Sequence, residues 1–218
     1  MVYMNSMQSR YKLGATDKMK IRKLRTKILG WGKTHRRKFS WRKKPTQYSV
    51  LIAEFFLQRT KAKQAEKQFK LFLHKYPTFN RVKRASTKDL KKFLIPLGLK
   101  KRVRLLKKLI EAISKKYNGK IPTKYDDLKK LPGIGDYTAS AILVFAMNKP
   151  VGIVDANTIK IFSDLFNLKL SREDGKKSKF IKMCAEYYSS LNNPRVSNWF
   201  LLDYAANRRS IKIKKSKN

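Results

Sequence analysis

Residues 131–142 of the chain have the sequence LPGIGDYTASAI, which predicts two helices joined by a tight turn. Gly133 and Gly135 permit backbone conformations that other residues avoid, so the chain can reverse direction here within a few residues. The N–H groups at the start of the second helix point outward, and the helix dipole adds positive charge there. Such a hairpin can bind a phosphate group, although the glycines could equally serve only to end one helix and begin the next.

Apolar residues recur at steps of three and four through most of the remaining chain, and β alternation is rare, so we predict an all-α fold. Helices are expected at 19–31, 48–57, 62–75, 87–94, 101–117, 126–131, 137–147, 180–191 and 197–206. Another helix is expected directly after Asp155, which is placed to cap it. Residues 1–20 are expected to be basic and poorly ordered, residues 169–179 to form a polar linker, and residues 209–218 to form a basic tail.

The chain of 218 residues carries 54 Lys and Arg against 14 Asp and Glu, a formal net charge of +40. Repulsion among so many positive charges opposes folding, and a bound polyanion would relieve it. We therefore expect nucleic acid as the partner. A lysine-rich proteome would also raise these counts, and an anionic membrane surface is the competing partner. Because the sequence has neither a run of roughly 18 apolar residues nor a signal peptide, we expect a cytoplasmic, nucleoid-associated protein that binds no membrane.

Few residues are available for metal or disulfide chemistry. Cys184 is the only cysteine, so one chain cannot form a disulfide or a four-cysteine iron–sulfur site. His35 and His74 are the only histidines, which argues against an imidazole-based metal centre. Any chemistry must therefore depend on carboxylates, tyrosine, lysine or backbone dipoles.

Two acidic residues are distinguished by their surroundings. Glu54 lies within YSVLIAEFFL, residues 48–57, which is apolar on nearly all sides and predicts a buried helix. A buried carboxylate is costly, so Glu54 is expected to be paired, protonated or functional, unless it lies on a solvent-facing side of the helix. Asp155, in the sequence VDAN at residues 154–157, could do no more than cap the helix that follows.

The hairpin, followed by VDAN, resembles the signature of the helix-hairpin-helix glycosylases, the family of endonuclease III and of the adenine-mismatch and thymine-mismatch glycosylases. The resemblance covers most of residues 25–208, including HRRKFSWR (35–42), AEFFLQRT (53–60) and PLGLKKR (96–102). It implies two helical lobes with DNA in the cleft between them. The expected lobes are a six-helix lobe at 45–150, which contains the hairpin, and a second lobe formed by 21–44 with 151–208. Most members bind an iron–sulfur cluster through four cysteines after the final helix, so this chain departs from the family there.

The same resemblance implies three catalytic residues. Asp155 matches the family's aspartate that stabilises positive charge on the deoxyribose as the base leaves. Glu54 matches a glutamate that contacts the base, and a carboxyl group among apolar side chains suits donation of a proton or hydrogen bond. Tyr137 stands where bifunctional members carry a lysine that forms a Schiff base, so no dedicated lyase activity is expected. Tyr137 would lie beside the flipped nucleotide, unless it merely packs on a neighbour.

The remaining expected contacts are to DNA. Gln58 and Arg59 resemble the residues that fill the gap in the base stack after a nucleotide is flipped out. The expected DNA-binding residues are Gln58, Arg59, Lys100, Arg102, Gly133, Ile134, Gly135, Tyr137 and Thr138. The resemblance also implies a potassium or sodium ion on hairpin backbone carbonyls, assigned to Leu131 and Ile134. No cofactor is otherwise expected to be required.

We therefore expect a monofunctional DNA glycosylase of base excision repair, acting as a monomer on double-stranded DNA with a mismatched or damaged base. Thymine or uracil opposite guanine is favoured, because Ala156 follows Asp155 as in thymine-mismatch enzymes and the extra C-terminal domain of the adenine enzymes is missing. The alternatives are an adenine glycosylase acting opposite guanine or 8-oxoguanine, an alkylation or restriction-associated glycosylase, a bifunctional glycosylase-lyase, and a non-catalytic DNA-binding protein with the same hairpin.

Overall fold

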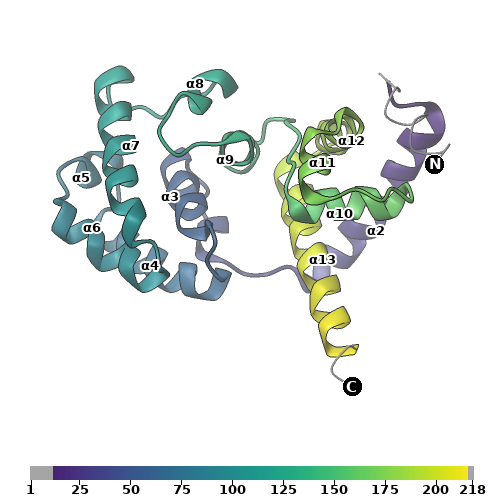
Figure 1. The fold of residues 1–218 in the computed structure, drawn as a ribbon, viewed down its shortest axis with the longest axis horizontal. Coiled ribbons are helices and arrows are strands. Elements are labelled where there is room, and N and C mark those ends of the chain that lie inside the picture. The colour runs from purple at the N-terminus through teal and green to yellow at the C-terminus, as the bar shows by residue number, and fades with distance from the viewer. Residues whose placement is uncertain (1–11, 216–218) are drawn as a thin grey trace. The chain divides into compact units, whose positions relative to one another are not determined.

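The computed structural model describes the backbone of residues 12–215 and the side chains of residues 12–207. These residues form helices and no strand, which confirms the all-α prediction for them. The chain divides into two compact units (Figure 1). The central unit is Lys38–Met147, and the terminal unit combines Met1–Arg37 with Asn148–Asn218. Both boundaries fall a few residues earlier in the chain than the expected limits at residues 45 and 150.

The central unit consists of short helices packed around an apolar core. In chain order they are α3 (Gln47–Leu57), α4 (Ala62–Lys75), α5 (Phe79–Lys83), α6 (Thr87–Leu94), α7 (Val103–Lys116), α8 (Tyr125–Lys129) and α9 (Asp136–Ala141). The turns η1 (Ser40–Arg42), η2 (Ile95–Leu97) and η3 (Lys100–Arg102) are 3-10 helical, and η4 (Ile142–Ala146) is π-helical. The unit therefore has seven α-helices where six were expected. The short α5 was not predicted; Thr78 caps it by accepting a hydrogen bond from the Arg81 N–H.

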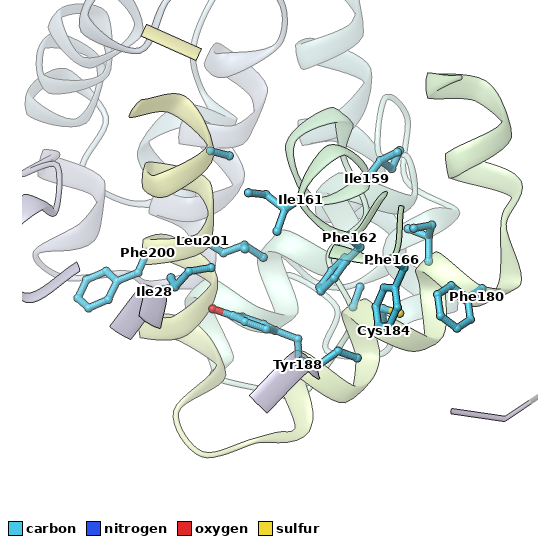
Figure 2. Close-up of a cluster of buried hydrophobic side chains, with 14 residues drawn as sticks. Ile28, Ile159, Ile161, Phe162, Phe166, Phe180, Cys184, Tyr188, Phe200 and Leu201 are labelled. Atoms are coloured by element: carbon cyan, nitrogen blue, oxygen red, sulfur yellow. The ribbon is translucent and has the colours of Figure 1, made fainter. Parts of the chain in front are cut away.

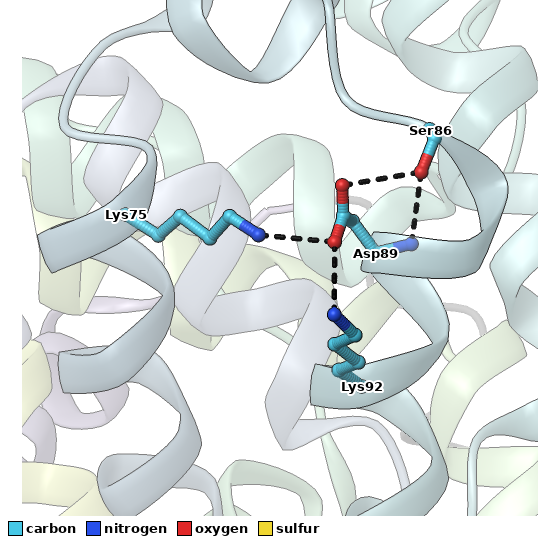
Figure 3. A network of polar contacts seen from close by, with 4 residues as sticks. All are labelled: Lys75, Ser86, Asp89 and Lys92. Atoms are coloured by element: carbon cyan, nitrogen blue, oxygen red, sulfur yellow. Dashed lines mark hydrogen bonds and ion pairs between the residues drawn. The ribbon is translucent and has the colours of Figure 1, made fainter.

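Polar contacts around Asp89 join α4 to α6 (Figure 3). The Ser86 hydroxyl accepts a hydrogen bond from the Asp89 N–H and donates one to the Asp89 carboxylate, each at 3.1 Å. The other carboxylate oxygen lies 3.0 Å from the Lys75 ammonium and 3.3 Å from that of Lys92. Hydrogen bonds from Lys75 and Lys92 lower the pKa of Asp89. Because these groups are exposed, the network orients the start of α6 more than it stabilises the fold.

The terminal unit contains α2 (Ala15–His35), α10 (Ala156–Leu165), α11 (Arg172–Lys177), α12 (Lys179–Ser190) and α13 (Pro194–Lys215). The expectation that residues 1–20 are poorly ordered is wrong for residues 15–20, which are helical; residues 1–11 lie outside the described part. The linker expected at 169–179 contains α11, and α13 continues to residue 215 through most of the expected tail.

The core of the terminal unit lies among α2, α10, α12 and α13 (Figure 2). The rings of Phe162 and Tyr188 meet edge to face with their centroids 6.1 Å apart. The buried Tyr188 hydroxyl donates a hydrogen bond to the Ser197 carbonyl at 3.0 Å, so its polar end is satisfied. Cys184 lies in the same core, and burial raises its pKa to about 12. The single thiol is therefore protonated and unreactive at neutral pH.

Two glycines of α2 have opposite surroundings. A Cβ on Gly32 would lie 2.1 Å from Cδ2 of Phe200 on α13, whereas a Cβ on Gly30 would meet no atom within 4 Å. Gly32→Ala is expected to lower the free energy of unfolding by about 3 kcal/mol through overpacking. Gly30→Ala is expected to raise it by about 1 kcal/mol, because alanine favours the helix. Urea unfolding measures both, and equal values would contradict the close packing of α2 on α13.

Candidate functional site

The predicted hairpin runs from α8 through a turn into α9. Leu131 and Ile134 are buried, and the Ile134 N–H donates a hydrogen bond to the Leu131 carbonyl at 3.1 Å, which closes the turn. Gly133 has a φ of +80°, and a Cβ there would lie 2.8 Å from Cδ2 of Leu105 on α7. Backbone conformation and packing both require glycine at position 133.

Gly135 is not required in the same way. It begins α9 in an extended conformation, with φ −93° and ψ −178°, and a Cβ there would meet no atom within 4 Å. Because glycine supplies no capping side chain, the first N–H groups of α9 have neither an intrahelical acceptor nor one from the cap. A partner that approaches this backbone closely would explain the glycine. The side chains of Ile134 and Thr138 are buried, so only their backbone groups could contact DNA.

The first residue of α9 is acidic and is bound by two side chains of α8. The side chain of Asp136 is 78% exposed. Its Oδ1 accepts a hydrogen bond from the Tyr125 hydroxyl at 2.7 Å and another from the Lys129 ammonium. Burial and the Asp136 carboxylate raise the pKa of Tyr125 well above its usual value, so the phenol remains a donor. These contacts join the two helices of the hairpin where α9 begins.

Glu54 lies on α3, which begins with a capping box. The Thr46 hydroxyl accepts a hydrogen bond from the Ser49 N–H at 3.1 Å, and the Ser49 hydroxyl accepts one from the Thr46 N–H at 2.9 Å. Residues 49–56 are all buried, and Glu54 is 6% exposed, which excludes a solvent-facing position. Since α3 packs against α9 and η4, the carboxyl group is carried on a helix in contact with the second helix of the hairpin.

The chain leaves α3 through a strained turn. The Thr60 N–H donates a hydrogen bond to the Leu57 carbonyl at 3.2 Å; Gln58 has φ −61° and ψ 108°, and Arg59 has a φ of +62°. This is a type II turn, which favours glycine or asparagine at the third position. Every other non-glycine residue with left-handed φ in the described chain is asparagine, so Arg59 alone holds a costly conformation. Such strain is typical of functional sites.

Asp155 caps α10, as the sequence predicts, and its carboxylate is held by three donors. Oδ1 accepts hydrogen bonds from the N–H groups of Asn157 at 2.9 Å and Thr158 at 2.8 Å, and Oδ2 accepts one from Asn157 Nδ2 at 2.9 Å. The residue is partly exposed. The carboxylate therefore has a fixed orientation, and its two oxygens can accept further hydrogen bonds beyond these three.

The other predicted residues lie on the central unit. Tyr137 is the second residue of α9 and is partly exposed. Lys100 is exposed and Arg102 partly exposed on η3, which follows the left-handed Gly98. Glu54, the turn at 57–60 and the hairpin thus belong to the central unit, whereas Asp155 belongs to the terminal unit.

Sequence reasoning missed several features of this region. The strain at Arg59 has no local signal, because neither glycine nor asparagine marks the turn. The cluster of Asp136, Lys129 and Tyr125 joins residues seven and more apart on two helices. The π-helical η4 has an apolar sequence, ILVFA, which is equally suited to an α-helix, although π-helical segments are frequent near functional sites.

The described chain has neither a cluster of side chains suited to a metal ion nor a candidate membrane span. No three His, Cys, Asp or Glu side chains come together there in a way that could hold a metal ion. None of its described helices is long and apolar enough to cross a membrane. The expected site for a monovalent cation uses backbone oxygens instead, and the Leu131 carbonyl has one lone pair left after accepting the bond from Ile134.

Comparison with known proteins gives consistent matches. The profile of a family described as "HhH-GPD superfamily base excision DNA repair protein" matches residues 52–189. A thymine/uracil-DNA glycosylase of Pyrobaculum aerophilum is 38% identical over 149 residues, which are 67% of this chain and 65% of that protein. A thymine-DNA glycosylase of Aeropyrum pernix is 31% identical over 72% of this chain and 71% of its own length. The solved structure of a thermostable thymine-DNA glycosylase superposes with a TM-score of 0.78 at 29% identity, covering 88% of each chain.

Proposed function

Since the chain belongs to the HhH-GPD superfamily of base excision DNA repair proteins, we propose that it is a DNA glycosylase that removes thymine or uracil opposite guanine. The names of the relatives from Pyrobaculum and Aeropyrum support thymine and uracil as the bases removed. The observation that carries the proposal is the burial of Glu54 on α3, the helix packed against the hairpin. An apolar residue would serve packing at least as well, so a carboxyl group in this place indicates a chemical role.

In the proposed reaction the hairpin holds a phosphate of the duplex against the first N–H groups of α9, where Gly135 leaves room for it. Gln58 and the strained Arg59 enter the base stack as the target nucleotide rotates out. Glu54 donates a proton or hydrogen bond to the leaving base, and Asp155 stabilises the positive charge on the sugar. Water then adds to the sugar and leaves an abasic site.

The proposal includes a monofunctional reaction by a monomer. Tyr137 cannot form the Schiff base that strand cleavage requires, which supports hydrolysis without lyase activity. Lys100 and Arg102 would contact the DNA backbone as cations. No cofactor is needed for these steps, although the carbonyls of Leu131 and Ile134 would hold a potassium or sodium ion that helps to neutralise the bound phosphate.

A panel of end-labelled duplexes tests the proposed activity. Duplexes with T:G and U:G are expected to form alkali-labile abasic sites about tenfold or more faster than duplexes with A:G or adenine opposite 8-oxoguanine. Borohydride is expected to trap no covalent adduct with any of them. Faster excision of adenine than of thymine or uracil would contradict the proposed substrate and would indicate an adenine glycosylase. Tight binding without an abasic product from any duplex would reject the glycosylase.

A further inference from the structure

The proposed phosphate site has a carboxylate at its entrance. Asp136 is the first residue of α9, and its side chain is 78% exposed. An aspartate there stabilises the helix through its dipole, but it repels a phosphate bound at the same helix end. Two unit charges about 6 Å apart change a binding constant about threefold in water and about a hundredfold at the effective dielectric of a protein surface. Left alone, Asp136 would therefore weaken the binding of DNA.

The structure shows what offsets this charge. Lys129 and Tyr125, one turn apart on α8, both donate to the same oxygen of Asp136. The Lys129 side chain is 36% exposed, less than half as much as that of Asp136. The neighbouring Lys130 differs, because its ammonium pairs with Asp127 of α8 at 3.1 Å and not with α9.

We propose that Lys129 is a charge-compensating residue of the hairpin, which neutralises Asp136 so that the start of α9 can bind a DNA phosphate. Asp136 can then join α8 to α9 without repelling the duplex. Lys129 therefore contributes more to DNA affinity than an ordinary surface cation, and its contribution depends on the charge of residue 136. The inference rests on the proposed phosphate binding by the hairpin.

A double-mutant cycle on binding tests the inference. The probe is a short, fully matched, fluorescently labelled duplex, and its dissociation constant is measured by anisotropy at fixed salt for wild type, Lys129→Gln, Asp136→Asn and the double variant. Lys130→Gln is the matched control, since it removes one adjacent, ion-paired lysine. Circular dichroism and thermal unfolding monitor the fold, and asparagine can still accept the Tyr125 hydrogen bond.

Lys129→Gln is expected to weaken binding about tenfold, and Lys130→Gln about twofold. Asp136→Asn is expected to tighten binding about threefold in the wild-type protein and more than tenfold in the Lys129→Gln protein, so the double variant returns close to wild type. An additive cycle, or equal losses for Lys129→Gln and Lys130→Gln, would overturn the inference.

Duplex binding by Gly135→Leu distinguishes failure of the proposed phosphate site from failure of the proposed role of Lys129. Gly135→Leu places its Cβ in open space at an unstrained φ, so it is expected to block the start of α9 while the fold, monitored by circular dichroism, is kept. If Gly135→Leu binds the duplex normally, the hairpin is not the phosphate site, and both the proposed phosphate binding and the role of Lys129 are rejected. If Gly135→Leu weakens binding but the cycle is additive, only the role of Lys129 is rejected.

Discussion

Replacing Asp155 by asparagine is expected to slow base excision by about a hundredfold to a thousandfold while the terminal unit stays folded. Asparagine has nearly the same shape and is an equally good N-cap, so α10 should keep its first turn. The charge is what changes, because a neutral amide cannot stabilise the positive charge on the deoxyribose. The rate is measured in single turnover, with protein in excess over an end-labelled U:G duplex, so that it reports the chemical step.

Ser178→Ala is the matched control for Asp155. Ser178 caps α12 in the same unit, where its hydroxyl accepts a hydrogen bond from the Ile181 N–H at 3.3 Å. Its loss should cost about 1 kcal/mol of stability, comparable to a damaged cap on α10. If Asp155 acted only as a cap, Asp155→Asn would keep that cap and would lose no more rate than Ser178→Ala. An excision rate of Asp155→Asn equal to that of the wild-type protein would show that Asp155 has only a structural role.

The two acidic residues were predictable from sequence for different reasons. From Val50 to Leu57 only Glu54 interrupts the apolar residues, so the sequence favours a buried Glu54, and the structure excludes the solvent-facing alternative. The cap at Asp155 was expected because aspartate is a preferred N-cap residue, and the structure adds Thr158, which completes a capping box with it. Their particular chemical roles do not follow from either pattern, since a buried carboxyl group indicates a chemical role without saying which one, and capping has a purely structural explanation. The family resemblance is what raised both to catalytic candidates.

Helix α11 was not predicted, because it has no apolar periodicity, although Ser171 caps it by accepting a hydrogen bond from the Asp174 N–H at 3.1 Å. Its sequence, REDGKK, has no apolar face. A Cβ on Gly175 would lie 2.3 Å from Cγ2 of Ile159, so this helix lies directly against α10 by its glycine. Such packing cannot be deduced from a polar sequence with a glycine, which normally indicates a linker.

The hairpin glycines are a second case in which the sequence does not predict the packing. Sequence alone does not distinguish the role of Gly133 from that of Gly135, since either could serve the turn, a helix end or close approach to a partner. In the structure Gly133 is required by its left-handed φ and by Leu105, whereas Gly135 is required by nothing in the described chain. Only the coordinates separate a glycine that the fold needs from one that a partner would need.

Replacing Glu54 by glutamine is expected to slow excision about a hundredfold or more, the usual contribution of a general acid. Glutamine keeps the length and nearly the volume of the side chain and can still accept and donate hydrogen bonds, so the free energy of unfolding should hold within about 1 kcal/mol. Glu66→Gln is the matched control, since Glu66 on α4 is also partly buried, with its side chain 19% exposed, and accepts a hydrogen bond from the Ser40 N–H at 2.9 Å. A rate loss in both variants would indicate damage to the central unit rather than a role for Glu54.

A second substrate separates the roles of the two acids. 5-Fluorouracil is a better leaving group than uracil, so its departure needs less help from a proton donor. The defect of Glu54→Gln should therefore shrink on a duplex with 5-fluorouracil opposite guanine. The defect of Asp155→Asn should persist there, because the sugar carries positive charge whichever base departs. Equal rescue of both variants, or of neither, would contradict the assignment of Glu54 to the base and Asp155 to the sugar.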